Sequence, residues 1–219
     1  MKTRGIVILL CLFLFSSCIV KSIQPFYIKE AIKYNPILKG DWTDHKKGKW
    51  KIVSFKEEWE KETDPNTKLS KEDRNAYERY KNAYYIQYTK KESEAAFIAM
   101  PFIVNEHFFI DLTPFEYDSN DLNKLVAQHL LKTHSTAHVE INDDDTIKLK
   151  WLSEKAVGSL IKNKKLRLKH ESTGIDEDLV LTATSEELHA FLKKFMSSDF
   201  EDKWDNDDIY SLTRSNAKP

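Results

Sequence analysis

The fold is decided by the stretch AHVEINDDDTIKLKW, residues 137–151. Polar side chains separate its apolar positions, which are Ala137, Val139, Ile141, Ile147, Leu149 and Trp151. A period of two with one polar face is typical of a half-buried antiparallel strand. The polar run Asn142–Asp145 divides the stretch into two halves. We therefore predict a β-hairpin whose turn is formed by that run.

The same alternation recurs along most of the chain. Further strands are expected around Trp50 and Ile52, and over residues 84–88, 95–104, 108–112, 166–170, 179–183 and 209–212. The early strands follow one another without helices between them. A parallel sheet needs long crossover connections, so an antiparallel arrangement is favoured.

Four helices are expected among these strands. Ser70 and Asp73 resemble a capping box that opens a polar helix. Residues 120–131 form the second helix, Ser153 caps the third, and Ser185 caps the clearest one. The sequence thus predicts an α+β, β-rich fold: an antiparallel curled sheet or barrel with three to four packed helices.

The N-terminus has the order of a secretory signal. Basic Lys2 and Arg4 precede the ten-residue apolar run 6–15, which is too short for a membrane-spanning helix of about 20 residues. The segment Leu14–Cys18, read Leu-Phe-Ser-Ser-Cys, resembles the bacterial lipobox. That resemblance implies cleavage before Cys18 and acylation of its thiol. A plain signal peptide or an uncleaved anchor is the alternative.

The cysteine content fits this reading. Cys11 lies within the leader, so the mature chain keeps only Cys18 and has no intramolecular disulfide. Ile19 follows Cys18, which by analogy with sorting in two-membrane bacteria favours the outer membrane. We expect a location in the cell envelope, with the membrane as a partner through acyl chains on Cys18.

These features divide the chain into four parts. They are a signal peptide at 1–17, a lipidated tether with a possible short helix at 18–39, one β-rich globular domain at 40–214 and a disordered tail at 215–219. Without Lys2 and Arg4 the chain keeps 32 basic and 35 acidic residues, a formal charge of −3. This balance gives no general attraction to nucleic acid, so no nucleic-acid partner is expected.

Two resemblances concern the body of the chain. Residues 82–196, especially HLLKTH at 129–134 and LTATSEEL at 181–188, resemble a family of uncharacterised bacterial lipoproteins. This implies a leader and a β-rich body, and it implies no enzymatic activity. Gly40-Asp41-Trp42 resembles the Gly-x-Trp that opens the first strand of lipocalin-like barrels. The later basic partner of that motif is not assigned from the sequence.

The histidines His129, His134 and His138 are the main candidates for metal chemistry. In a helix, His134 and His138 would lie one turn apart and could share an ion. Residues 136–141 are expected to form a strand, however, in which four residues span about 13 Å, whereas Zn–N bonds are about 2 Å long. The alternation also places these histidines outside the core, solvated or locally hydrogen-bonded.

Other catalytic patterns are incomplete. His170-Glu171 begins the motif His-Glu-x-x-His, but Gly174 stands where the second histidine belongs. The sequence contains neither Gly-x-Ser-x-Gly nor a glycine-rich phosphate loop. No catalytic, cofactor-binding or metal site is expected, although a Ser–His–Asp group could assemble from distant positions.

The remaining conspicuous residues favour structural roles. The acidic runs at 143–145 and 205–208 are expected to be solvated turns, and Trp50 and Trp151 to lie in the core. Trp59 is expected at the surface or over a barrel end. We therefore expect a membrane-anchored envelope lipoprotein that binds a protein or small molecule. The alternatives are a lipocalin-like carrier of a lipid-like ligand and a hydrolase with a dispersed site.

Overall fold

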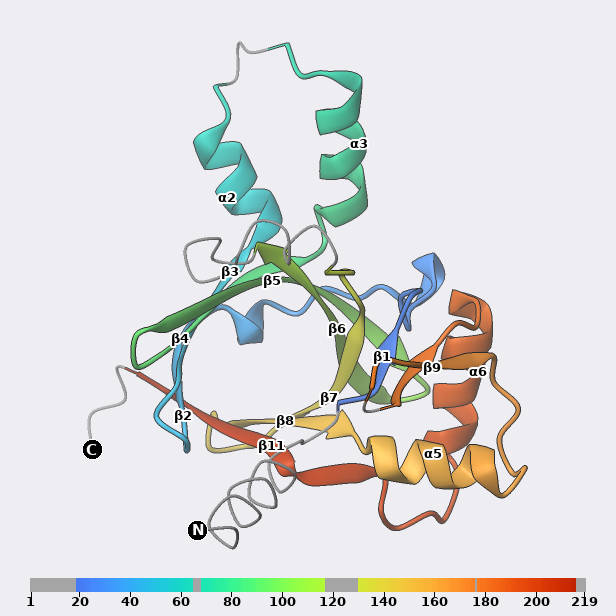
Figure 1. Ribbon diagram of the computed structural model, residues 1–219. Coiled ribbons are helices and arrows are strands. Elements are labelled where there is room, and N and C mark those ends of the chain that lie inside the picture. Colours follow the sequence, from blue (N-terminus) through green and yellow to red (C-terminus); the bar gives the residue numbers. More distant parts are fainter. Residues whose placement is uncertain (1–18, 65–67, 117–129, 176, 216–219) are drawn as a thin grey trace, which may run out of the picture.

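The computed structural model describes residues 19–64, 68–116, 130–175 and 177–215, and Figure 1 shows a β-barrel with helices packed around it. Several predicted features lie outside these residues. They are the signal peptide at 1–17, Cys18, most of the helix at 120–131, His129 and the tail after Ser215.

Eight strands close into one antiparallel barrel in the order β11-β2-β3-β4-β5-β6-β7-β8. The strands are β2 (Gly40–Asp44), β3 (Lys49–Ser54), β4 (Tyr84–Lys90), β5 (Ser93–Val104), β6 (His107–Glu116), β7 (Ser135–Ile141), β8 (Ile147–Leu152) and β11 (Trp204–Arg214). Each strand from β2 to β8 pairs with the next along the chain, and β11 closes the ring between β2 and β8. This confirms the predicted β-rich α+β fold.

The barrel interior is filled by the inward-facing residues of these alternating patterns. The predicted hairpin forms from β7 and β8, and five of its six apolar positions are buried in this core. The sixth, Ile141, ends β7 and is 37% exposed. Trp42, Trp50 and Trp151 belong to the same core, so the prediction for Trp50 and Trp151 is confirmed.

A second apolar layer covers the outer wall of β5, β6 and β8. It consists of the sheet β1-β10-β9 and two helices beside it (Figure 1). These elements are β1 (Lys21–Ser22), β9 (His170–Thr173), β10 (Asp178–Leu181), α5 (Glu154–Lys162) and α6 (Ser185–Met196). Phe102, Phe109 and Leu152 of the barrel share one buried cluster with Leu188 and Phe191 of α6. The outward faces of these barrel strands therefore also carry buried apolar residues.

Helices α2 (Phe55–Glu62) and α3 (Lys71–Tyr80) follow β3 and extend away from the barrel (Figure 1). Helix α3 starts at the predicted cap, because the Ser70 side chain accepts a hydrogen bond from the Asp73 amide. Helix α2 is not predicted by the alternation. Its Trp59 stacks on Phe55, with the ring centroids 5.6 Å apart, and Phe55 is buried against the outer face of the barrel.

Residues 19–39, predicted as a tether with a possible short helix, pack onto the barrel. Val20 and Phe26 are almost completely buried. The segment forms two short 3-10 turns, η1 (Lys29–Ala31) and η2 (Pro36–Leu38). Pro36 opens the second turn and does not close an earlier helix, as proline fits the first position of a helical turn.

Three boundaries differ from the sequence prediction. Strand β9 begins at His170, so residues 166–169 are not a strand. Helix α6 is capped by Thr184 and not by Ser185, because the Thr184 hydroxyl and the side chain of the third helical residue complete a capping box. Residues 205–208 belong to β11, at a shift in its register against β8, and are not a solvated turn.

Candidate ligand site at the barrel mouth

The direction of the strands distinguishes the two ends of the barrel. Neighbouring strands are antiparallel, so β2, β4, β6 and β8 all run the same way. The segments that follow them, including residues 45–48 and 91–92 and Ser153, lie at one end, which we call the mouth. The opposite end is closed by η2. There the Trp42 indole N–H donates to the Leu38 carbonyl at 2.9 Å, and Leu38 is 2% exposed.

A layer of aromatic side chains lies beneath the mouth. The ring of Trp50 is 4.6 Å from Tyr88 and 5.7 Å from Tyr210, measured between centroids. Tyr210 is in turn 5.4 Å from Trp151. Tilted and edge-on contacts at these distances are favourable for aromatic pairs. Trp50 and Trp151 are buried and the two tyrosines partly exposed, so the layer forms an apolar floor with an accessible edge.

Asp44 holds this floor to the turn between β2 and β3. One carboxylate oxygen accepts hydrogen bonds from the amides of Lys46 and Gly48, both at 2.8 Å. The other oxygen accepts from the Trp50 indole N–H at 2.8 Å. Burial and the nearby charge of Asp44 raise the pKa of Tyr88 to about 12. The Tyr88 hydroxyl donates a hydrogen bond to the Asp44 carboxylate, so its aromatic ring is what it offers to a ligand.

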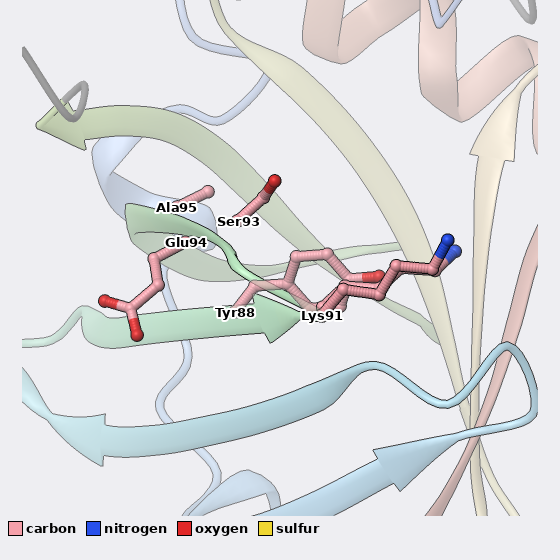
Figure 2. A pocket seen from close by; sticks show the side chains of 6 residues that line it. Tyr88, Lys91, Ser93, Glu94 and Ala95 are labelled. Carbon is pink, nitrogen blue, oxygen red and sulfur yellow. The ribbon is translucent and has the colours of Figure 1, made fainter. Parts of the chain in front are cut away.

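A hollow of about 390 Å³ opens beside Tyr88, at the turn between β4 and β5. Its wall is formed by Tyr88, Lys90, Lys91, Ser93, Glu94 and Ala95. Figure 2 shows Tyr88 and Lys91 extending in the same direction, while Glu94 points the opposite way. The hollow thus presents an ammonium group beside an aromatic face. Such a set suits a ligand that carries an anionic group next to an apolar group.

A second hollow of about 620 Å³ lies between α5 and the strand β9. Both charge signs line it, including Glu154, Lys162 and Glu177, and its wall contains no tryptophan, tyrosine or phenylalanine. Each residue of β9 is exposed. The hollow at the mouth is the better candidate because an aromatic side chain, Tyr88, forms part of its wall.

Outside the barrel, the structure pairs one predicted histidine with a residue that the sequence did not single out. The ring nitrogen Nδ1 of His134 lies 2.6 Å from Oδ1 of Asp111 and 2.9 Å from the Thr113 hydroxyl. The other oxygen of Asp111 accepts a hydrogen bond from the Phe26 amide at 2.8 Å. Burial raises the pKa of Asp111, and the bonds from His134 and Phe26 oppose that rise. The locally hydrogen-bonded state predicted for His134 is confirmed, and the pair fastens residues 19–34 to the barrel wall.

His138 corrects the prediction that these histidines lie outside the core. It is 8% exposed, and its ring stacks on Trp204 with centroids 5.1 Å apart and planes 10° apart. The second apolar layer covers this outward face of β7, which a period of two assigns to solvent. Burial lowers the pKa of His138 to about 4, so the ring is neutral at physiological pH.

Within the described ranges, no group of three histidine, cysteine, aspartate or glutamate side chains is placed to hold a metal ion. None of the described helices is long and apolar enough to cross a membrane. No protein-family model, no curated protein and no solved structure matches the chain.

Proposed function

We propose that this chain is an exported, lipid-anchored binding protein whose barrel holds a small anionic amphiphile at its mouth. The leader and Cys18 support a location in the cell envelope, and Ile19 favours the outer membrane. The protein would act by binding and not by catalysis.

The observation that carries this proposal is the hollow beside Lys91, whose wall includes Tyr88 of the aromatic layer. Its volume of about 390 Å³ lies at the lower end of the range of about 300–1,000 Å³ typical of small-molecule sites. The interior below the floor is occupied by buried side chains such as Ile52, Ile86 and Leu149. The ligand would place its anionic group near Lys91 and a short apolar part against Tyr88.

The closed end of the barrel supports the lipocalin-like resemblance. Arg214 lies over the ring of Trp42, the tryptophan of the Gly-x-Trp motif. It supplies a basic partner for that tryptophan from the last strand. A barrel closed at this end by a short helical turn leaves the mouth as the route by which a ligand enters.

Binding at the mouth can be tested with the fluorescent anionic amphiphile anilinonaphthalene sulfonate as probe. We expect its fluorescence to rise on binding to the native protein. The substitution Lys91→Glu should weaken its affinity about tenfold, which corresponds to about 1.4 kcal/mol. Lys165→Glu makes the same charge change on an exposed loop and should leave the affinity unchanged. Equal affinities of the two variants, or no binding by the native protein, would refute the site.

The anchor can be tested separately by labelling cells with radioactive palmitate. Cys18→Ser should abolish the label and release the protein from the membrane fraction. Cys11→Ser removes the other thiol, within the leader, and should leave labelling and membrane association unchanged. A Cys18→Ser protein that keeps the label would contradict the proposed address.

A further inference from the structure

Almost no free chain separates the predicted anchor, Cys18, from the barrel. Ile19 forms a β-bridge with Ser153, and Val20 is 1% exposed. Lys21–Ser22 then form β1, paired in parallel with β10. The Cα atom of Cys18 is one peptide unit, about 3.8 Å, from that of Ile19. Acyl chains on Cys18 would therefore hold the barrel directly at the bilayer surface.

The anchor leaves the barrel at its mouth. Ser153 directly follows β8, one of the strands that run toward the mouth. Ile19 is bridged to Ser153, and its side chain packs against the core of the barrel interior. The 3-10 turn η2, in contrast, lies at the closed end. Segment 19–34 thus runs along the outer wall from the mouth toward the closed end.

Four lysines lie at the two turns beside the hollow. Lys46 and Lys47 lie on the turn after β2, Lys90 ends β4, and Lys91 lies on the turn after it. Among the described residues, the acidic ones on the same segments include Asp44, Glu92, Glu94, Asp205, Asp207 and Asp208. Glu94 points away from Lys91 (Figure 2), and the backbone carbonyl of Asp207 accepts a hydrogen bond from Lys46. Of these four lysines, Lys90 and Lys91 line the hollow.

We infer that the mouth faces the bilayer that carries the acyl chains, and that the hollow takes the phosphate of an anionic phospholipid headgroup from that bilayer. Lys91 would pair with the phosphate, and the Tyr88 ring would pack against the apolar part of the headgroup. The acyl part of the same lipid would remain in the bilayer, which agrees with the filled interior of the barrel. This inference depends on the proposed lipid anchor and on the proposed site at the mouth.

The orientation can be measured with the mature acylated protein in vesicles of phosphatidylethanolamine and phosphatidylglycerol. Acylation blocks the thiol of Cys18, so a nitrobenzoxadiazole label attaches only to an introduced cysteine. In Lys91→Cys the label should shift its emission to the blue and be quenched several-fold less by iodide than in detergent solution. Asp143→Cys, in the exposed turn at the opposite end, should carry a label that stays fully open to iodide. Protection of the Asp143→Cys label alone, or of neither, would overturn the orientation.

The headgroup can be tested by displacing bound anilinonaphthalene sulfonate. Dihexanoylphosphatidylglycerol below its micelle concentration should displace the probe from the native protein and do so several-fold less well from the Lys91→Glu variant. Inorganic phosphate at the same concentration should not displace it. Equal displacement by inorganic phosphate would mean a site for the free anion, and no displacement by the lipid would exclude the headgroup; either result overturns the assignment.

These outcomes distinguish failure of the orientation from failure of the lipid anchor or of the ligand site. Failure of the anchor appears as a protein that does not float with the vesicles, and failure of the site appears as absence of probe binding in solution. A protein that floats and binds the probe, but whose Lys91→Cys label remains open to iodide, refutes the orientation alone.

Discussion

The guanidinium group of Arg214 lies over the indole ring of Trp42, 3.9 Å from the ring centroid. The same group donates hydrogen bonds to the carbonyls of Ile37, at 2.9 Å, and Lys39. Arg214 ends β11, and Trp42 lies in β2. Ile37 lies in the turn η2, and Lys39 directly follows that turn. One side chain therefore joins both edges of the barrel seam to the turn that closes its end.

The first prediction concerns this seam. Arg214→Ala removes a cation–π contact and two charge-assisted hydrogen bonds, so it should lower the free energy of unfolding by about 3 kcal/mol. Arg214→Lys keeps the charge but loses the planar fork, and should recover less than half of that loss. Urea unfolding followed by tryptophan fluorescence measures both values. Arg167→Ala, on an exposed loop, is the control and should change stability little.

The second prediction compares two glycines. A Cβ atom at Gly48 would collide with the ring of Tyr88 and the carboxylate of Asp44, whereas one at Gly158 in α5 would meet no atom within 4 Å. Gly48→Ala should therefore destabilise the protein by about 1–3 kcal/mol and weaken probe binding at the mouth. Gly158→Ala should stabilise it by about 0.5–1 kcal/mol, because alanine favours a helix. Thermal unfolding of both variants tests the contrast, and a stabilised Gly48→Ala would contradict the packing described for Asp44.

The third prediction concerns Asp111 and His134. Either replacement removes the short bond between the two side chains, and Asp111→Ala also leaves the Phe26 amide without its acceptor. Asp111→Ala and His134→Ala should therefore each cost about 2–4 kcal/mol of stability. Because both substitutions break the same bond, the double variant should lose about 1–3 kcal/mol less than the sum. A cycle on the exposed pair Glu78 and Lys81, which are 2.7 Å apart, should give a coupling close to zero. Additive losses at Asp111 and His134 would show that the pair does not act as a unit.

The fourth prediction concerns the response to pH. In the unfolded chain His138 takes its ordinary pKa of 6.5, and in the folded protein burial lowers that pKa to about 4. The unfolded state therefore binds the proton first, and stability should fall as the pH drops from about 6.5 to 4, by at most about 3 kcal/mol. Above pH 6.5 this residue should contribute no pH dependence.

His138→Phe removes the titrating group and keeps an aromatic ring against Trp204. Urea midpoints measured between pH 7.5 and 4 should then fall less steeply than in the native protein. His170→Ala, at an exposed position, should leave the slope unchanged. A native slope retained in His138→Phe would assign the acid sensitivity to another group.

The barrel was predictable because its signal is repeated along each strand. Alternation from residue 137 to 151 gave the hairpin and most of its buried positions. Helix α2 escaped prediction because its charged residues directly follow the alternation of β3, and its start depends on the single cap Ser54. The packing of residues 19–39 was not predicted because the residues that bury Phe26 lie far away in the sequence.

The sites were less predictable than the fold, for a related reason. A period of two reports which residues face one way, and it does not report what covers the other face. His138 is assigned to solvent by that rule, yet Trp204 covers it. Asp111 gave no signal because its partner Phe26 contributes a backbone amide, which every residue but proline possesses. The hollow at the mouth depends on how Tyr88 and Lys91 lie in three dimensions, which local spacing does not encode.

The strand that completes the ring, β11, is also the last one to be synthesised. Until Trp204–Arg214 has emerged, β2 and β8 are bare sheet edges, able to pair with other chains. Closure thus joins two strands that are far apart in the sequence, which makes folding slow compared with helix formation. A barrel that closes with its last strand stays open through most of its synthesis, and the export proposed above would require such an unfolded chain.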